Sequence, residues 1–168
     1  MKITVPGSGI EINIRRQPVQ VMDFLKAKIA EELASEKPVP PTQQVETAPG
    51  VFREVEAVHD DKYVQAMEEY ERKTAGKFIE RIWHNMATLA VTDEVTPDMV
   101  APYRAYYGDL GEVLPESDRE VWLRYEVAPS MDDFATLMYE IYGKSLPTDK
   151  QVAFHRLLFQ GRVQEKAD

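Results

Sequence analysis

The chain of 168 residues contains no cysteine, which excludes a disulfide framework and a cysteine-ligated zinc site. It also lacks any apolar run close to the roughly 20 residues that a membrane-spanning helix needs. Residues 1–5 do not provide the apolar core of a secretory signal. We therefore expect a protein of the cytoplasm that has no membrane partner.

Basic residues are scarce relative to acidic ones. The sequence has 20 Lys and Arg against 29 Asp and Glu, which gives a formal net charge of -9. The field of such a protein repels phosphate, so a nucleic-acid partner is not expected. The hydrophobic share of 43% is sufficient for one ordinary domain core, and we expect one domain with a hinge.

The first 34 residues have the pattern of a β-hairpin followed by a helix. Isoleucine and valine alternate with polar residues on either side of the turn-forming Pro6-Gly7-Ser8-Gly9. Pro18 suits the start of a helix. The apolar positions of that helix recur at helical spacing, at Val21 or Met22, Leu25, Ile29 and Leu33.

Residues 35–58 are predicted to form an extended, proline-rich arm. Prolines at positions 38, 40 and 41 fix φ and remove backbone donors, which excludes a helix interior or a central strand. Two interpretations remain open: the apolar residues of the arm pack on the protein's own core, or they bind a partner. The residues in question are Val39, Pro40, Pro41, Val45, Val51 and Phe52.

A single long helix is predicted from Asp60 or Asp61 to about Leu89. Its apolar positions recur every three or four residues, and Gly76 is a weak point at which the sequence leaves a kink open. The second half is the more apolar, so we expect it to be buried and the first half to be partly exposed. Three residues of the first half, which we expect to present an exposed edge, join the candidate partner-binding set: Tyr63, Met67 and Tyr70.

Shorter helices complete a predicted helical body over residues 59–161. Their starts are marked by Thr96-Pro97, Ser117-Asp118, and capping-box patterns at Ser130 with Asp133 and at Thr148 with Gln151. Gly143 and Gly161 are expected to end the last two helices, and residues 162–168 to form a frayed tail. The predicted fold is therefore α+β and mostly α-helical.

Catalytic patterns are weak. His59-Asp60-Asp61 offers metal ligands, but Asp60 and Asp61 are also favoured at a helix entry by the helix dipole. A metal-dependent hydrolase that uses His59, Asp60 and a third ligand is the alternative from the enzyme class. We expect no catalytic residue, cofactor or metal, and hence no enzymatic activity.

Three tyrosines, Tyr103, Tyr106 and Tyr107, are close together in the sequence. Such a cluster can stack on nucleobases when basic residues surround it. Because the surrounding sequence is not basic, core or interface packing is favoured.

The order of these segments resembles tail assembly chaperones and related small tail-module proteins of long-tailed bacteriophages. That family has a proline-rich segment and an acidic strand ahead of a helix with an Asp-x-x-Tyr-x-x-Ala-like start, which Asp60, Tyr63 and Ala66 match. Its closing helix has a Thr-x-x-x-Val pattern, which Thr148 and Val152 match. The likeness covers most of the chain.

The resemblance implies a non-enzymatic role in the cytoplasm of a bacterial host. Such chaperones coat the tape-measure protein, keep its hydrophobic helices soluble and recruit tail-tube subunits before leaving the particle. Members are often also made in a longer, frameshifted form. The family supplies no catalytic residues to carry over.

The alternative is a permanent virion protein: a tail, connector or capsid-surface subunit. In this case the proline-rich arm would latch onto a neighbouring copy, with the linker acting as a spacer of fixed length. Either role is compatible with a homo-oligomer.

Overall fold

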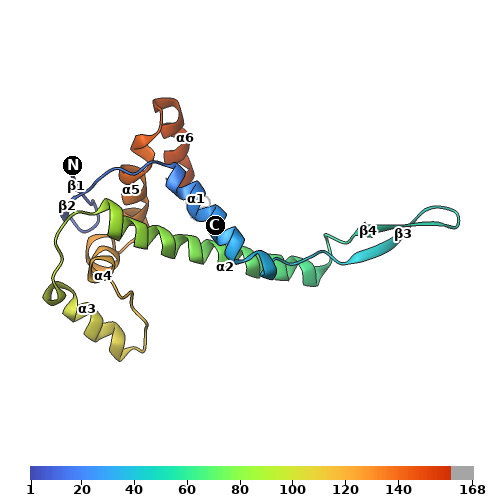
Figure 1. Ribbon diagram of the computed structural model, residues 1–168, viewed down its shortest axis with the longest axis horizontal. Coiled ribbons are helices and arrows are strands. Elements are labelled where there is room, and N and C mark those ends of the chain that lie inside the picture. The colour runs from blue at the N-terminus through green and yellow to red at the C-terminus, as the bar shows by residue number, and fades with distance from the viewer. Residues whose placement is uncertain (160–168) are drawn as a thin grey trace, which may run out of the picture. The chain divides into compact units, whose positions relative to one another are not determined.

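The computed structural model describes residues 1–159 (Figure 1). Its strands are β1 (Lys2–Thr4), β2 (Glu11–Asn13), β3 (Thr42–Ala48) and β4 (Val51–Glu56). Its α-helices are α1 (Gln20–Glu32), α2 (Asp61–Asn85), α3 (Pro97–Asp109), α4 (Asp118–Trp122), α5 (Met131–Ile141) and α6 (Thr148–Phe159). Four short helical segments follow helices: the 3-10 turns Ala34–Glu36 and Gly143–Ser145, and the π-helical turns Met86–Ala90 and Leu123–Val127. The predicted class, α+β and mostly helical, is confirmed.

The chain divides into two units. Unit 1 combines Met1–Asp23 with the chain from Arg81 onward, and unit 2 is the intervening Phe24–Glu80. The boundaries of these units differ from those of the segments 1–34, 35–58 and 59–161 expected from the sequence. The reason is that the N-terminal hairpin belongs to the same unit as the later helices. Each unit is described separately below.

The N-terminal hairpin of unit 1 has the predicted antiparallel pairing, with Ile3 opposite Ile12. Gly9 has a φ of 70°, a conformation that glycine adopts without a steric penalty. The hairpin turn is docked on the helices, since the Gly7 N–H donates to Asp133 Oδ1 at 2.7 Å and the Ser8 hydroxyl to the Val127 carbonyl at 2.6 Å. A Cβ on Gly7 would clash with the Asp133 carboxylate, so a larger residue there would displace this contact.

The core of unit 1 is built from the inner face of this hairpin and from the later helices. Trp83 packs on Phe134 with 4.6 Å between ring centres. Tyr142 is fully buried, and its hydroxyl donates to Asn85 Oδ1 at 2.8 Å. Many other buried side chains are apolar, among them Val5, Ile12, Ile14, Ile82, Met86, Val100, Val121, Leu123, Leu137 and Ile141.

The long helix has the predicted extent. Helix α2 runs through Gly76 without interruption and continues into the π-helical turn at Met86.

Burial in the second half of this helix is only partly as expected. Leu89 is 53% exposed, because the wider π turn changes which residues face the core, and Ile79 is also exposed.

Most later helix starts agree with the sequence patterns. The Ser117 hydroxyl accepts from the Glu120 N–H, and the Ser130 hydroxyl accepts from the Asp133 N–H. Thr96 precedes α3 as expected, but its side chain makes no capping hydrogen bond. The predicted end at Gly161 and the tail 162–168 lie outside the described residues.

Unit 2 contains the later part of α1, a linker, the hairpin β3–β4 and the first part of α2. Ile29 and Leu33 of this unit are fully buried. Lys73 forms an ion pair with Glu36, and the Lys26 ammonium lies 5.4 Å from the centre of the Phe78 ring. These contacts link α1 and the 3-10 turn after it with α2.

The second hairpin is a feature that the sequence analysis did not predict. Within the segment 35–58, expected to be an extended arm, β3 and β4 pair antiparallel from Thr42 opposite Glu56 to Ala48 opposite Val51. Gly50, with a φ of 74°, makes the turn between them. The prolines at 38, 40 and 41 precede β3, where their missing N–H groups do not interrupt the ladder.

Candidate interaction surface

The hairpin β3–β4 presents two chemically different faces. Directly opposed residues share a face, and successive residues alternate between faces. The register therefore places one set together, here called the apolar face: Gln43, Val45, Ala48, Val51, Arg53 and Val55. The opposite set is here called the acidic face: Thr42, Gln44, Glu46, Phe52, Glu54 and Glu56.

Both faces of this hairpin are open within unit 2. Every residue of β3 and β4 is exposed. Val51 is 50% exposed and Val45 40% exposed, so the apolar face meets solvent. An isolated two-stranded hairpin is marginally stable in water, and an uncovered apolar face is typical of a binding surface.

Local contacts hold the turn and base of the hairpin. The Gly50 N–H donates to Glu46 Oε1 at 2.7 Å, and a bulge between Glu46 and Ala48 shifts the register. At the base, the Ala57 N–H donates to the Pro41 carbonyl at 2.7 Å, which extends the pairing beyond the strands. The strands are therefore fixed to each other without help from the helices.

The candidate partner-binding residues of the arm do not form one continuous surface. Val45 and Val51 lie together on the apolar face, whereas Phe52, 59% exposed, lies on the acidic face. Val39 is 84% exposed in the linker before β3. Pro40 is half-buried, and Pro41 is exposed.

The candidates on α2 are less accessible than expected. Tyr63, Met67 and Tyr70 are half-buried, which corrects the expectation of an exposed edge. The exposed apolar residue in that turn is Val64, which the sequence analysis did not select. The hairpin, rather than the start of α2, is therefore the more accessible apolar surface of unit 2.

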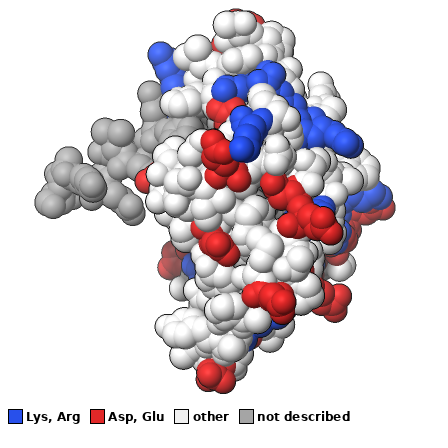
Figure 2. Space-filling view, turned by 90° about the vertical axis from the view of Figure 1, so that its left-hand side faces the viewer, with Lys and Arg blue, Asp and Glu red and all other residues white. Residues whose placement is uncertain are grey.

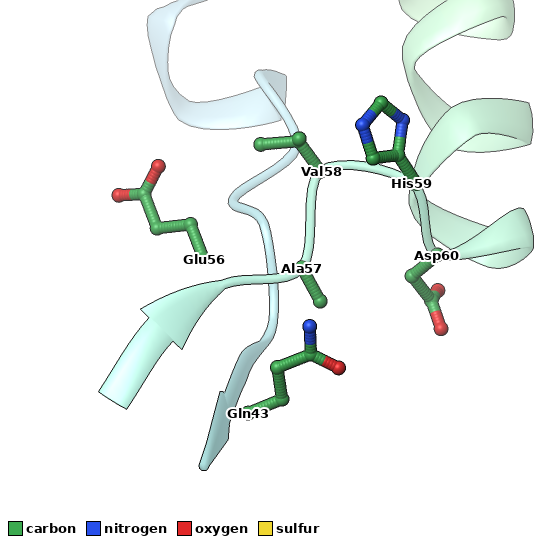
Figure 3. Close-up of a pocket in the computed structure, with 6 residues that line it drawn as sticks. All are labelled: Gln43, Glu56, Ala57, Val58, His59 and Asp60. Carbon is green, nitrogen blue, oxygen red and sulfur yellow. The ribbon is translucent and has the colours of Figure 1, made fainter. Parts of the chain in front are cut away.

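A shallow pocket of about 240 Å³ lies where the hairpin meets α2, lined by Gln43, Glu56, Ala57, Val58, His59 and Asp60 (Figure 3). Figure 3 shows the side chains of Glu56, His59 and Asp60 pointing in different directions. Asp60 Oδ1 accepts the backbone N–H groups of Lys62 and Tyr63, as a helix cap does. Within residues 1–159, no three His, Asp or Glu side chains are grouped as metal ligands. This pocket therefore offers no convergent chemical site.

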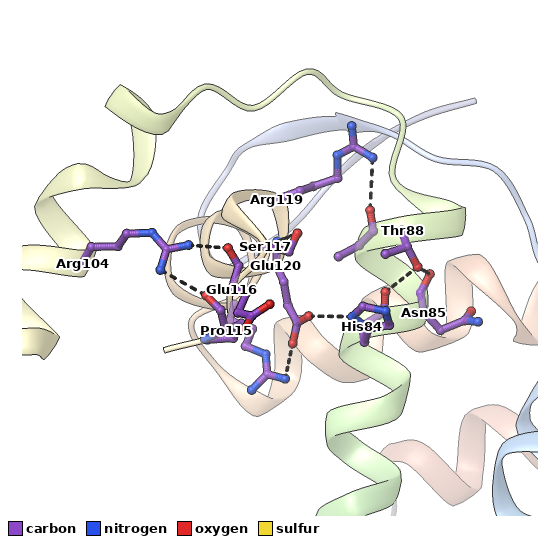
Figure 4. Close-up of polar contacts among 11 residues, drawn as sticks. His84, Asn85, Thr88, Arg104, Pro115, Glu116, Ser117, Arg119 and Glu120 are labelled. Atoms are coloured by element: carbon purple, nitrogen blue, oxygen red, sulfur yellow. Dashed lines mark hydrogen bonds and ion pairs between the residues drawn. The ribbon is translucent and has the colours of Figure 1, made fainter. Parts of the chain in front are cut away.

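A cluster of polar side chains in unit 1, drawn in Figure 4, makes contacts that hold segments of this unit in place. The buried Glu120 carboxylate is paired with Arg124 and lies 3.3 Å from His84 Nδ1. Arg104 donates to the Asp118 carboxylate and to the carbonyls of Pro115 and Glu116, which lie in and just before the start of α4. These bonds fix the connection between α3 and α4.

Charged side chains of unit 1 are mostly interspersed. Figure 2 shows acidic and basic groups side by side on one face of the molecule, among a larger number of uncharged residues. Several are paired, including Lys2 with Glu11 and Lys144 with Glu140. Surface pairs of this kind contribute little to stability, and they reduce the unbalanced charge that a charged ligand would recognise.

The tyrosine cluster packs two helical segments together. Tyr107 lies 4.5 Å and Tyr103 6.4 Å from the Tyr125 ring, measured between ring centres. Burial raises the pKa of Tyr103, and the negative charge of Glu126 raises that pKa further. Tyr106 is 63% exposed and contacts Tyr107 edge-on. The cluster therefore joins α3 to the turn Leu123–Val127.

Comparison with known proteins gives no match. No family model, no curated protein and no solved structure corresponds to this chain. Among the helices of residues 1–159, none combines the length and apolar character needed to span a membrane. The functional proposal therefore rests on the residues and geometry above.

Proposed function

We propose that this chain is a non-enzymatic tail assembly chaperone of a long-tailed bacteriophage, which binds the tape-measure protein and recruits tail-tube subunits in the host cytoplasm. The observation that carries the proposal is the exposed apolar face of the hairpin β3–β4. The family resemblance of the sequence supports the choice of client.

The two faces suit a chaperone for a hydrophobic client. Val45, Val51 and Val55 can cover apolar side chains of a partner and remove them from water. Glu46, Glu54 and the net charge of -9 keep the resulting complex dispersed by mutual repulsion. One element thus provides both client contact and solubility.

Coexpression with the tape-measure protein of the same phage tests the proposal. The test variant is Val45→Thr with Val51→Thr, which keeps β-branching and charge but adds hydroxyls to the apolar face. The control is Thr42→Ser with Gln44→Thr on the acidic face, which also leaves charge unchanged. We expect soluble, co-purifying tape-measure protein with the wild type and the control, and a several-fold loss with the test variant.

Equal recovery of the client with both variants would contradict the proposal. Equal melting temperatures of the two variants are required, so that a folding defect is not mistaken for a binding defect.

The second candidate is a permanent virion subunit. It is favoured by the 84% exposure of Val39 in the proline-containing linker, which suits an arm that contacts a neighbouring copy. Mass spectrometry of purified particles and of the producing lysate separates the candidates. Abundance in the lysate with absence from particles supports the chaperone, whereas many copies per particle support the virion subunit.

A further inference from the structure

We propose that the outer edge of β4 receives an extended strand of the partner, whose residues alternate between apolar and basic. This inference rests on the proposed protein-binding function and specifies how the partner binds. It concerns the backbone edge of the hairpin in addition to its apolar face.

Within residues 1–159, the sheet containing β3 and β4 has these two strands alone. Each strand therefore has an outer edge of backbone N–H and C=O groups that the other strand does not use, and such an edge is a template for strand addition. The edges differ, because the bulge between Glu46 and Ala48 interrupts β3. The extra residue of the bulge is in β3 and not in β4, and Phe52–Glu56 of β4 pair in one continuous register, so β4 provides the regular edge.

The side chains of β4 determine what an added strand should contain. Val51 and Val55 lie on the apolar face, and an added strand continues that face with its own alternate residues. Glu54 and Glu56 lie on the acidic face, where the intervening residues of the added strand come next to them. Cross-strand pairs of opposite charge stabilise a sheet, so these intervening residues should be Lys or Arg.

A second copy of β4 fits this edge poorly. When two copies of β4 pair antiparallel about a two-fold axis, the apolar faces of both copies lie on the same side of the sheet. One residue of the strand then lies directly opposite the same residue of the second copy. The two registers that pair most of the strand place Arg53 opposite Arg53 or Glu54 opposite Glu54. Directly opposed like charges destabilise a sheet, so charge complementarity favours a different, basic partner.

Synthetic peptides test this inference on the full chain. The probe is acetyl-Val-Lys-Val-Lys-Thr-Lys-amide. Its first control is the block sequence acetyl-Val-Val-Thr-Lys-Lys-Lys-amide, which has the same composition, and its second is the alternating peptide with Glu in place of Lys. We expect the probe to bind about tenfold more tightly than either control.

Amide hydrogen exchange measured by NMR locates the bound strand. Strand addition slows exchange at alternate amides of β4, those directed away from β3, whereas docking on the apolar face alone leaves them unchanged. The double variant Glu54→Lys with Glu56→Lys should reverse the preference, so that the Glu peptide binds more tightly than the Lys peptide. Without peptide, the amide exchange rates of β3 and β4 in this variant must match those of the wild type, which shows that the hairpin is intact.

Failure of this inference is distinguishable from failure of the proposed function. Unprotected β4 amides, or equal binding of the probe and the block peptide, would overturn strand addition even where the coexpression test succeeds. Slowed exchange at alternate amides of β4, together with the reversed peptide preference of the double variant, would support strand addition. This holds even where the tape-measure protein stays insoluble.

Discussion

At the scale of single residues, the most informative side chains are the buried polar ones. Asp133 is 2% exposed, and its carboxylate accepts hydrogen bonds from the Gly7 N–H and the Ser130 hydroxyl. Ser130 in turn accepts from the Asp133 N–H at 3.1 Å. One carboxylate thus holds the capping hydroxyl of Ser130 at the start of α5 and anchors a turn that lies 126 residues away in the sequence.

Replacing Asp133 should destabilise unit 1. Asp133→Ala removes both acceptors and leaves the Gly7 N–H without its partner, which should cost about 2–3 kcal/mol of the free energy of unfolding. Both tryptophans, Trp83 and Trp122, lie in the core of unit 1, so their fluorescence during urea unfolding reports on this unit. Asp149→Ala, at an exposed position in the first turn of α6, is the control and should change stability by less than about 1 kcal/mol. Equal effects would show that the Gly7 contact contributes nothing.

Tyr142 should make unit 1 sensitive to alkali. Burial raises the pKa of its hydroxyl well above the usual range, so the phenol stays protonated in the folded state after it has ionised in the unfolded state. The unfolded state then binds fewer protons, and stability falls as pH rises above about 10, the pKa of an unperturbed tyrosine.

The variant Tyr142→Phe isolates this effect. It loses the hydrogen bond to Asn85, at a cost of about 1 kcal/mol at neutral pH, but its stability should fall less steeply above pH 10. Tryptophan fluorescence in urea at a series of pH values measures how steeply the free energy of unfolding falls with pH in the variant and in the wild type. Parallel slopes for the variant and the wild type would refute the assignment.

At the scale of elements, the two hairpins have opposite surroundings, and the longer one is the exposed one. Hairpin β1–β2 buries Ile12 and contributes Val5 to the core, while all residues of β3 and β4 are exposed. The free energy gained from apolar burial therefore comes from the first hairpin and scarcely from the second. A hairpin that gains so little free energy from burial contributes little to stability, and such an element is typical of a functional site.

Deleting the second hairpin should leave the core intact. Replacing Thr42–Glu56 with a short Gly-Ser linker removes exposed residues only, so the midpoint of tryptophan-monitored urea unfolding should be unchanged. Removing residues 1–13, which include two fully buried side chains, should lower that midpoint strongly. A large loss of stability on deleting the second hairpin would show that it packs against other parts of the chain.

At the scale of the whole molecule, the main core and the proposed binding surface lie in different units. Unit 1 contains the buried tryptophans and the docked N-terminal hairpin, whereas unit 2 contains the uncovered hairpin. The net charge of -9 applies to both and favours dispersion of the protein and of its complexes. The proposed client contact can therefore be altered without disturbing the unit that holds the main core.

The sequence by itself determined the features that depend on neighbouring residues. Helical periodicity predicted α2, the caps Ser117 and Ser130 predicted helix starts, and alternation around residues 6–9 predicted the first hairpin. The second hairpin was also encoded locally, by Pro49-Gly50 between alternating residues, but the preceding prolines favoured an extended arm instead.

Only the tertiary structure decided which of these elements are covered. The contact between Gly7 and Asp133, the exposure of Leu89 and the partial burial of Tyr63 depend on residues far away in the sequence or on a change of helix type. Local propensity is set by a residue and its near neighbours, whereas burial is set by what packs against it. An exposed valine face has the same sequence pattern as a buried one, so its availability for binding became visible only in the fold.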